Sequence, residues 1–79
     1  MALQVLLAAT LRKYFPDYDH AVGLEVHLKR GMTVLEMARQ INLPVEDVKL
    51  ILVNGRAAKW DTVLQGDERV ALFPPVGGG

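Results

Sequence analysis

The chain ends in an apolar strand pattern, two prolines and three glycines, and this ending constrains the fold more than any other feature. The final residues are Phe73-Pro74-Pro75-Val76-Gly77-Gly78-Gly79. Proline fixes the backbone angle φ and has no N–H to donate, so Pro74 and Pro75 end the preceding strand and stiffen the exit from the sheet. Glycine loses more freedom on ordering than any other residue, so we expect a flexible tail over residues 74–79. A frayed end without a role is the alternative. The stiff spacer favours a tail that threads a tunnel and presents its carboxylate to an enzyme.

The composition is that of one small domain with a hydrophobic core. Of 79 residues, 51% are hydrophobic and none is cysteine, so disulfides and thiolate metal sites are excluded. Nine basic and nine acidic side chains cancel, which argues against a nucleic-acid partner. The apolar segment Met1–Leu11 lacks the basic region and cleavage site of a signal peptide and is too short to cross a bilayer. We therefore expect a cytoplasmic protein with no membrane partner.

Two strands are predicted in the first half of the chain. The first covers Ala2–Leu11, where a helix is the competing interpretation, and a loop follows from Arg12 to Asp19. One face of the first strand carries Leu3, Val5, Leu7 and Ala9, and the other carries Gln4, Leu6, Ala8 and Thr10. Apolar and polar residues alternate more regularly over Leu24–Lys29, which predicts a half-buried second strand.

The clearest helix begins after Thr33. Thr33 and Glu36 have the spacing of a capping box, in which each side chain accepts from the other residue's backbone N–H. The expected buried stripe consists of Val34, Leu35, Ala38 and Ile41, with Met37 beside it. Asn42 tolerates the left-handed conformation that ends helices, and Pro44 prevents continuation. Pro44–Val48 is predicted to form one short helical turn.

The second half of the chain predicts three more strands. A buried strand over Lys49–Val53 is followed by the hairpin-turn pair Asn54-Gly55 and a short return strand over Arg56–Ala58. Residues 60–64 cross back, and the last strand covers Glu68–Phe73. In the last strand Val70 and Leu72 share one face, and Arg69, Ala71 and Phe73 share the other. This order predicts a two-layer α+β domain, with the first and last strands adjacent in the middle of the sheet.

Several short motifs, taken together, resemble one protein family. The final segment is GDERVALFPPVGGG over residues 66–79, Gly31-Met32-Thr33-Val34 opens the helix, and Val53-Asn54-Gly55 follows the third long strand. In this order and at this chain length they resemble the MoaD/ThiS family of sulfur-carrier proteins. The resemblance covers most of the chain except the loop over residues 14–21. It implies a ubiquitin-like β-grasp fold in a single domain, residues 1–79. That fold has a mixed sheet of four to five strands with one main helix packed across it.

The resemblance also implies a function for the terminal glycines. In such carriers a partner enzyme resembling ubiquitin activators uses ATP to adenylate the terminal carboxylate, here that of Gly79 in the Gly78-Gly79 pair. Sulfur then replaces one oxygen and gives a thiocarboxylate. The chain would be a protein co-substrate, not an enzyme, and would bind no cofactor itself. Gly77 would lengthen the flexible part, and removal of the third glycine, which would make Gly78 the active end, stays open.

The segment Phe73-Pro74-Pro75 is more similar to the small subunit of molybdopterin synthase than to the carrier of thiazole synthesis. There the carrier inserts its tail into a larger catalytic subunit, which uses the sulfur to build a dithiolene on a pterin. Three alternatives stay open: sulfur transfer for thiamine thiazole or another pathway, a non-covalent interaction module with an inert tail, and conjugation to protein lysines. The motifs do not separate molybdenum from tungsten.

The expected contacts with partners extend from the tail onto the adjoining sheet face. They are Leu6, Arg69, Ala71, Phe73, Pro74, Pro75, Val76 and Gly77. An outward Phe73 beside the tail favours a docking surface, although Tyr14, Phe15 or the long loop could cover it within the monomer. Arg69 either steers acidic partner residues or is a solvated strand arginine.

The remaining side chains give weaker signals. His20 with Asp17 and Asp19, and His27 with Glu25, match no closed zinc site, so we expect surface histidines and no metal. The sequence contains no serine for a hydrolytic triad and no Gly-rich phosphate loop with a lysine. Trp60 is expected to pack in the core or at an edge.

Overall fold

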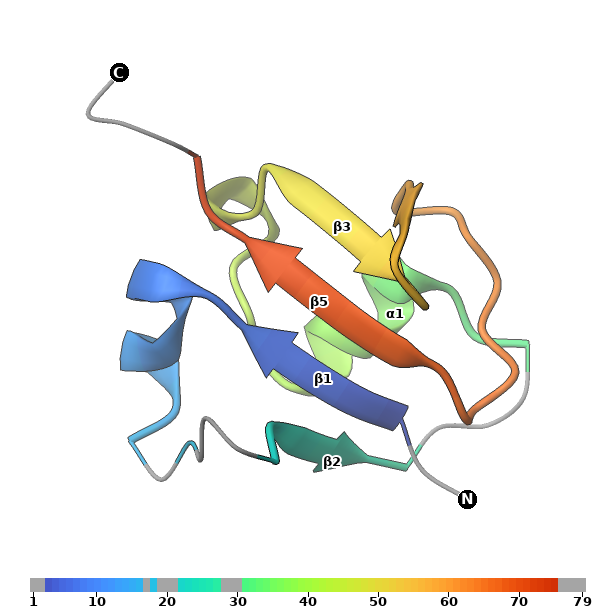
Figure 1. The fold of residues 1–79 in the computed structure, drawn as a ribbon, viewed down its shortest axis with the longest axis horizontal. Coiled ribbons are helices and arrows are strands. Elements are labelled where there is room, and N and C mark those ends of the chain that lie inside the picture. Colours follow the sequence, from blue (N-terminus) through green and yellow to red (C-terminus); the bar gives the residue numbers. More distant parts are fainter. Residues whose placement is uncertain (1–2, 17, 19–21, 28–30, 76–79) are drawn as a thin grey trace.

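A computed structural model of the chain describes residues 3–16, 18, 22–27 and 31–75. Over these residues one α-helix packs across one face of a five-stranded mixed sheet (Figure 1). The strands are β1 (Leu3–Leu7), β2 (Leu24–Val26), β3 (Leu50–Val53), β4 (Arg56–Ala58) and β5 (Arg69–Phe73). The α-helix is α1 (Val34–Gln40), and two short 3-10 helices are η1 (Ala9–Tyr14) and η2 (Val45–Asp47). The predicted two-layer α+β architecture is confirmed.

The first and last strands lie side by side in the middle of the sheet, as predicted. The strand order is β2-β1-β5-β3-β4, and β1 runs parallel to β5 with Leu7 opposite Leu72. The other three pairings are antiparallel. Because β5 is central, the chain that follows it leaves from the middle of the sheet, near η1 (Figure 1).

Local sequence signals account for the connections between these elements. Thr33 forms the predicted capping box: its Oγ1 accepts from the Glu36 N–H at 3.2 Å, and Glu36 Oε1 accepts from the Thr33 N–H at 3.0 Å. Asn42 has a φ of 61° just after the helix, the left-handed conformation that was expected there. Asn54 and Gly55 have φ values of 51° and 83°, as a two-residue turn between β3 and β4 requires.

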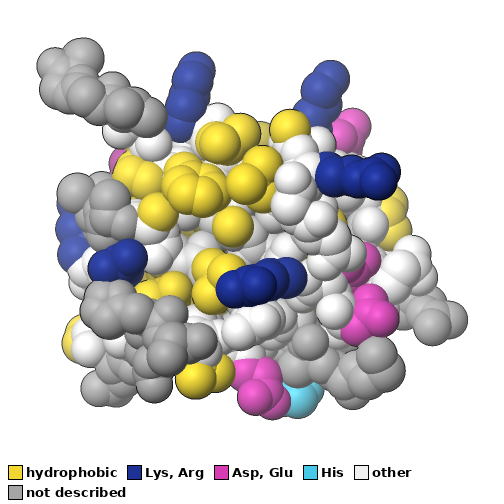
Figure 2. Space-filling model, in the orientation of Figure 1, with side chains coloured by type: hydrophobic (Ala, Val, Ile, Leu, Met, Phe, Trp, Pro, Cys, Tyr) yellow, Lys and Arg dark blue, Asp and Glu magenta, His cyan; other side chains and the backbone are white. Residues whose placement is uncertain are grey.

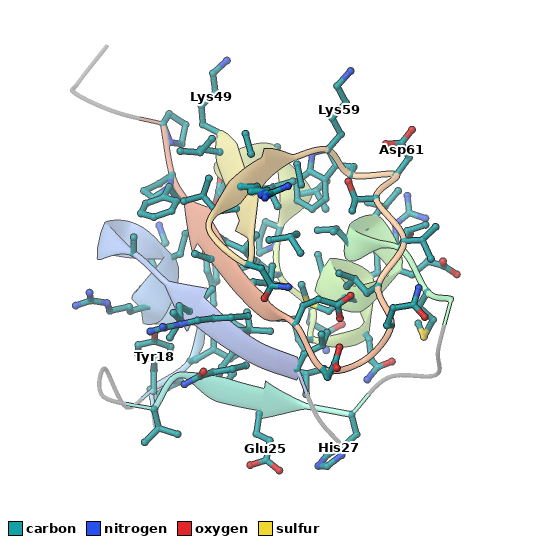
Figure 3. The ribbon with its side chains drawn as sticks, turned by 45° about the vertical axis from the view of Figure 1, so that its right-hand side comes forward. Tyr18, Glu25, His27, Lys49, Lys59 and Asp61 are labelled. Carbon is teal, nitrogen blue, oxygen red and sulfur yellow. The ribbon has the colours of Figure 1, made fainter. Side chains whose placement is uncertain are left out.

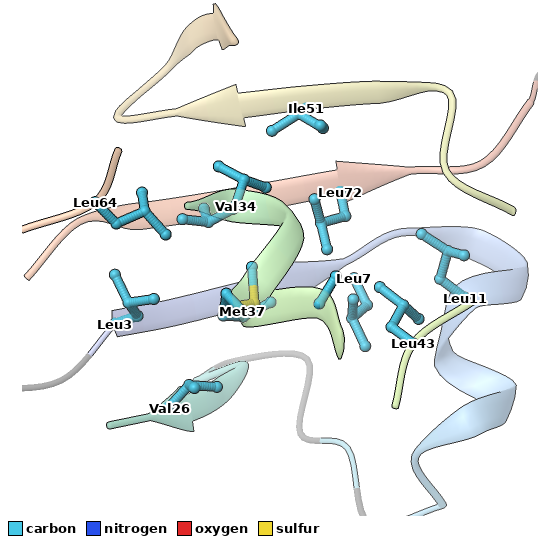
Figure 4. Close-up of a cluster of buried hydrophobic side chains, with 13 residues drawn as sticks. Leu3, Leu7, Leu11, Val26, Val34, Met37, Leu43, Ile51, Leu64 and Leu72 are labelled. Atoms are coloured by element: carbon cyan, nitrogen blue, oxygen red, sulfur yellow. The ribbon is translucent and has the colours of Figure 1, made fainter. Parts of the chain in front are cut away.

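The core fills the space between α1 and the sheet (Figure 4). Its buried side chains are Leu3, Val5, Leu7, Leu11, Val26, Val34, Met37, Ala38, Leu43, Ile51, Leu64, Val70 and Leu72. The predicted helix stripe is partly wrong, because Leu35 and Ile41 are half-buried whereas Met37 is fully buried. In a helix of seven residues, positions 34, 37 and 38 already form one face. Ile41 lies past the end of the helix and reaches the core only at its margin.

The predicted strand over Ala2–Leu11 is too long, and the loop predicted after it begins as a helix. The ladder with β5 ends when the Ala8 N–H donates to the Leu72 carbonyl at 3.1 Å, and the chain then turns into η1. The turn brings Leu11 into the core, where it is 1% exposed. The apolar run therefore continues past Leu7 because a helical turn also buries Leu11.

Two other predicted strands are also shorter in the structure. Only residues 24–26 of the second predicted strand form β2, and Leu28 and Lys29 lie outside the described residues. The strand predicted over Lys49–Val53 begins at Leu50, which is 43% exposed and not buried. Its side chain lies on the sheet face away from the helix, beside Phe73.

Candidate functional site: the open face of the sheet and the base of the tail

The sheet face opposite α1 presents apolar side chains from three neighbouring strands. We call it the open face and define it by Leu6, Leu50, Leu52, Arg69, Ala71 and Phe73. Leu6 and Leu52 lie opposite Ala71 on its two sides, and Leu50 lies opposite Phe73. Because side chains alternate along a strand, Leu7, Val70 and Leu72 point to the core instead. Figure 2 shows the resulting patch of hydrophobic side chains on this face.

The predicted orientation of Leu6, Ala71 and Phe73 is thereby confirmed. All three are half-buried and contribute to the surface away from the helix. Tyr14 and Phe15, which could have covered Phe73, pack against the core. The Tyr14 hydroxyl donates to the Asp47 carboxylate, so its ring connects η1 to η2. That hydrogen bond is the main reason that the pKa of Tyr14 is raised above 10.0.

The tail begins where β5 loses its last hydrogen bond. The Phe73 carbonyl accepts from the Lys49 N–H at 2.8 Å, and the next residue is Pro74, which has no N–H. Pro74 is half-buried and Pro75 is exposed, so the expected strand stop is confirmed. Val76, Gly77, Gly78 and Gly79 lie outside the described residues, and their predicted roles stay predictions.

Two hollows lie on the open face on either side of Arg69. The larger, about 520 Å³, is lined by residues of β1, β3 and β5 and by the turn residues Asn54 and Gly55. The smaller, about 230 Å³, lies at the base of the tail and includes Phe73. Its polar lining consists of Arg12, Tyr18 and Arg69. A separate hollow of about 370 Å³ at the β1–β2 edge lies away from the tail.

Arg12 is the charged residue of this site that the sequence interpretation missed, and Leu50, Leu52 and Tyr18 were missed as well. Its Nε donates to the Leu7 carbonyl at 3.0 Å, and its guanidinium carbon lies 5.9 Å from the centroid of the Tyr18 ring. The Tyr18 hydroxyl accepts from the Leu7 N–H at 2.9 Å. The pairing of the first and last strands could have indicated where Arg12 lies. Because the two strands are parallel, residues that directly follow the first strand lie near the point where the last strand ends.

A buried carboxylate fixes the turn that leads into β5. Glu68 is 8% exposed and accepts from the backbone N–H groups of Gln65, Gly66 and Asp67 at 2.7, 2.9 and 3.2 Å. Burial raises the pKa of the Glu68 carboxyl, but the backbone N–H groups together outweigh burial and lower it below 4.5. We infer that this turn sets where Arg69, the first residue of β5, enters the sheet.

The predicted surface role of His27 is confirmed. Its Nε2 lies 3.2 Å from Glu25 Oε1, and both side chains are about 70% exposed on the outer side of β2 (Figure 3). No three histidine or acidic side chains in the described part of the chain are placed to hold a metal ion. Asp17, Asp19 and His20 lie outside the described residues. Trp60 is half-buried and packs against the core, as expected.

No helix in the described ranges is both long and apolar enough to cross a membrane.

The fold and the site together define a class of protein. A mixed sheet with parallel central strands, crossed by one helix, is the ubiquitin-like β-grasp fold, and here the central strand leads into a glycine-rich tail. The chain belongs to the ThiS family, whose profile matches residues 5–79, and is thus of the small sulfur-carrier type. This confirms the predicted fold and family.

Solved structures share this fold. SAMP1 from Haloferax volcanii has a TM-score of 0.71 and 22% sequence identity, with all of both chains covered. A Pyrococcus furiosus protein described as molybdopterin converting factor, subunit 1, has a TM-score of 0.70 and 27% identity. The match covers 96% of this chain and 99% of that one. A search of curated protein sequences finds no match.

Proposed function

We propose that this protein carries sulfur on the carboxylate of Gly79. A carboxylate oxygen attacks the α-phosphorus of ATP and pyrophosphate leaves, which gives an acyl-adenylate. A persulfide sulfur then attacks the acyl carbon and AMP leaves, and a thiol reduces the resulting acyl disulfide to the thiocarboxylate. The protein itself supplies the carboxylate and its presentation, and the ATP is bound by the partner enzyme.

The observation that carries this proposal is where the tail begins. β5 lies in the centre of the sheet and its last residue, Phe73, belongs to the apolar open face. A partner that covers this face would therefore meet the start of the tail at the same time. Pro74 and Pro75 stiffen the first step away from the sheet, and Gly77 to Gly79 have no side chains to obstruct a narrow tunnel.

The proposed partners are two proteins that use the same tail in turn. The first is an adenylating enzyme of the ubiquitin-activator type, which uses the ATP. The second is the larger catalytic subunit of molybdopterin synthase, which takes the sulfur to build a dithiolene on a pterin. The Pyrococcus relative described as molybdopterin converting factor, subunit 1, and the segment Phe73-Pro74-Pro75 support this pathway. Because the open face adjoins the tail, we propose that both partners bind through it.

The test is the intact mass of the protein after incubation with the activating enzyme, ATP and a persulfide donor. We expect a mass gain equal to the replacement of one oxygen by sulfur, located in the C-terminal peptide. A variant with one alanine added after Gly79 is the matched control and should stay unmodified. Full modification of that variant, or no modification of the native protein by an enzyme that forms its adenylate, would refute the thiocarboxylate role.

The pathway is tested separately with the thiocarboxylated protein. Incubation with the purified larger subunit and its pterin substrate should yield the dithiolene with loss of sulfur from the carrier. If sulfur passes instead to a thiazole-forming enzyme, the thiamine pathway replaces the molybdopterin one. Isopeptide-linked products that resist reducing agents would indicate conjugation to lysines.

A further inference from the structure

The open face carries positive charge although the whole chain is neutral. Lys and Arg side chains surround the apolar patch in the view of that face, whereas the acidic side chains visible there lie towards its margin (Figure 2). Lys49 and Lys59 project on the side of the molecule opposite His27 and Glu25 (Figure 3). A surface with an apolar centre and a basic surround is complementary to a partner with an apolar centre and acidic side chains around it.

The hollow at the base of the tail brings two of these positive charges together. Arg12 of η1 and Arg69 of β5 are far apart in sequence, yet both line the hollow of about 230 Å³ at the base of the tail. We propose that this hollow binds the carboxylate of a glutamate or aspartate side chain from the protein that docks on the open face. The partner's apolar side chains would cover Leu6, Ala71 and Phe73. This inference rests on the proposed function, because it specifies the chemistry of the docking partner.

A hydrogen bond holds each of these two arginines in place. The Nε of Arg12 donates to the Leu7 carbonyl at 3.0 Å, and its guanidinium carbon lies 5.9 Å from the centroid of the Tyr18 ring, so the side chain is anchored through Nε and its two Nη groups are left for a ligand. Arg69 extends from a central strand whose backbone is fixed by Asn54, which accepts from the Arg69 N–H at 3.0 Å. A carboxylate fits two N–H donors of a guanidinium at once, and anchoring reduces the freedom lost on binding.

The apolar lining of the hollow strengthens the attraction between the two arginines and a bound carboxylate. The apolar side chains of Leu6, Ala71 and Phe73 line the hollow, so a partner that covers it excludes water and lowers the local dielectric. Among the described residues, no carboxylate forms an ion pair with Arg12 or Arg69. An incoming carboxylate would therefore not displace a described internal one.

A pair of short peptides tests the hollow without any enzyme. The probe is a blocked tetrapeptide with two glutamates between a leucine and a phenylalanine, and the control has glutamines in place of the glutamates. We expect the glutamate peptide alone to shift the ¹⁵N side-chain NMR signals of Arg12 and Arg69, with no comparable shift at Arg39, which is exposed on α1. Equal shifts with both peptides, or an equal shift at Arg39, would overturn the proposal.

Charge reversal tests it with the protein partner. In an adenylation assay with the activating enzyme, Arg69→Glu should raise the KM for the carrier about tenfold at low salt, and the difference should shrink at high salt. Arg39→Glu makes the same charge change on the helix and should leave KM within about twofold. Equal KM values for the two variants would overturn the inference while the proposed function stands. If the native protein is not adenylated at all, the proposed function fails. The peptide experiment alone then tests whether the hollow binds a carboxylate.

Discussion

The turn before β5 depends on one carboxylate, and its removal should destabilise the whole domain. In Glu68→Ala, three backbone N–H groups lose their acceptor. Those of Gln65 and Asp67 belong to exposed residues and can turn to water, whereas Gly66 is buried and its N–H is left without a partner. A hydrogen bond to a charged acceptor contributes about 1.5–3 kcal/mol, so we expect a loss of about 2–4 kcal/mol.

Thermal unfolding measures this loss directly. For a domain of this size, 1 kcal/mol corresponds to about 4–8 °C in Tm, so Glu68→Ala should melt roughly 10–25 °C lower at neutral pH. Asp67→Ala removes a neighbouring exposed charge and is the control, with an expected change within about 0.5 kcal/mol. A drop of less than about 4 °C for Glu68→Ala would refute the assignment of the turn to this carboxylate.

The pH dependence gives an independent check through Glu68→Gln. The folded pKa of Glu68 lies below the ordinary value of 4.5, so its ionised form stabilises the native state. That stability is present above pH 4.5 and is lost as the pH falls through the folded pKa. The native protein should therefore be more stable than Glu68→Gln at neutral pH, and the difference should close in acid. A difference that stays constant from neutral pH to about pH 3 would contradict the argument.

Three further perturbations test other parts of the structure. Gly23→Ala should cost at least about 2 kcal/mol more than Gly31→Ala in urea unfolding. Both glycines have positive φ, but only at Gly23 would the new Cβ lie 2.6 Å from a β1 carbonyl oxygen; equal costs would refute the clash. Asp47→Asn should lower the pKa of Tyr14, followed by tyrosinate absorbance. Because the folded pKa is raised, stability from this bond is full below pH 10.0 and is lost as the pH rises through the folded value; an unchanged titration would refute the link. Ala71→Asp should weaken binding of the activating enzyme at least about tenfold with Tm nearly unchanged, and unaltered binding would exclude the open face.

Local patterns in the sequence were sufficient for most of the fold. The alternation in the last strand, the capping box at Thr33 and the Asn54-Gly55 turn depend on neighbours within a few residues, and all three are confirmed. The central position of the last strand and the outward direction of Phe73 followed from element order and strand phase. These parts of the candidate site were therefore predictable.

The errors lie where distant residues decide the structure. Leu11 is buried by the helical turn that follows the end of the ladder between β1 and β5, whereas the apolar run alone indicated a longer strand. Arg12 reaches the open face through that same turn and could not be placed from its own neighbours. Glu68 was expected to start a strand, but its carboxylate instead binds the preceding turn. Acidic residues next to a turn are usually solvated, which gave no sign of its burial.

The parallel pairing of β1 with β5 also determines how the domain responds to pulling. The N-terminal side of the described chain enters β1 at one end of the sheet, and the chain leaves β5 at the other (Figure 1). A force between these two points acts along both strands in opposite directions, so it loads their connecting hydrogen bonds in shear, all at once, and cannot open them one after another. We therefore expect the domain to be mechanically resistant. A partner could draw the tail into a tunnel without unravelling the sheet to which it is attached.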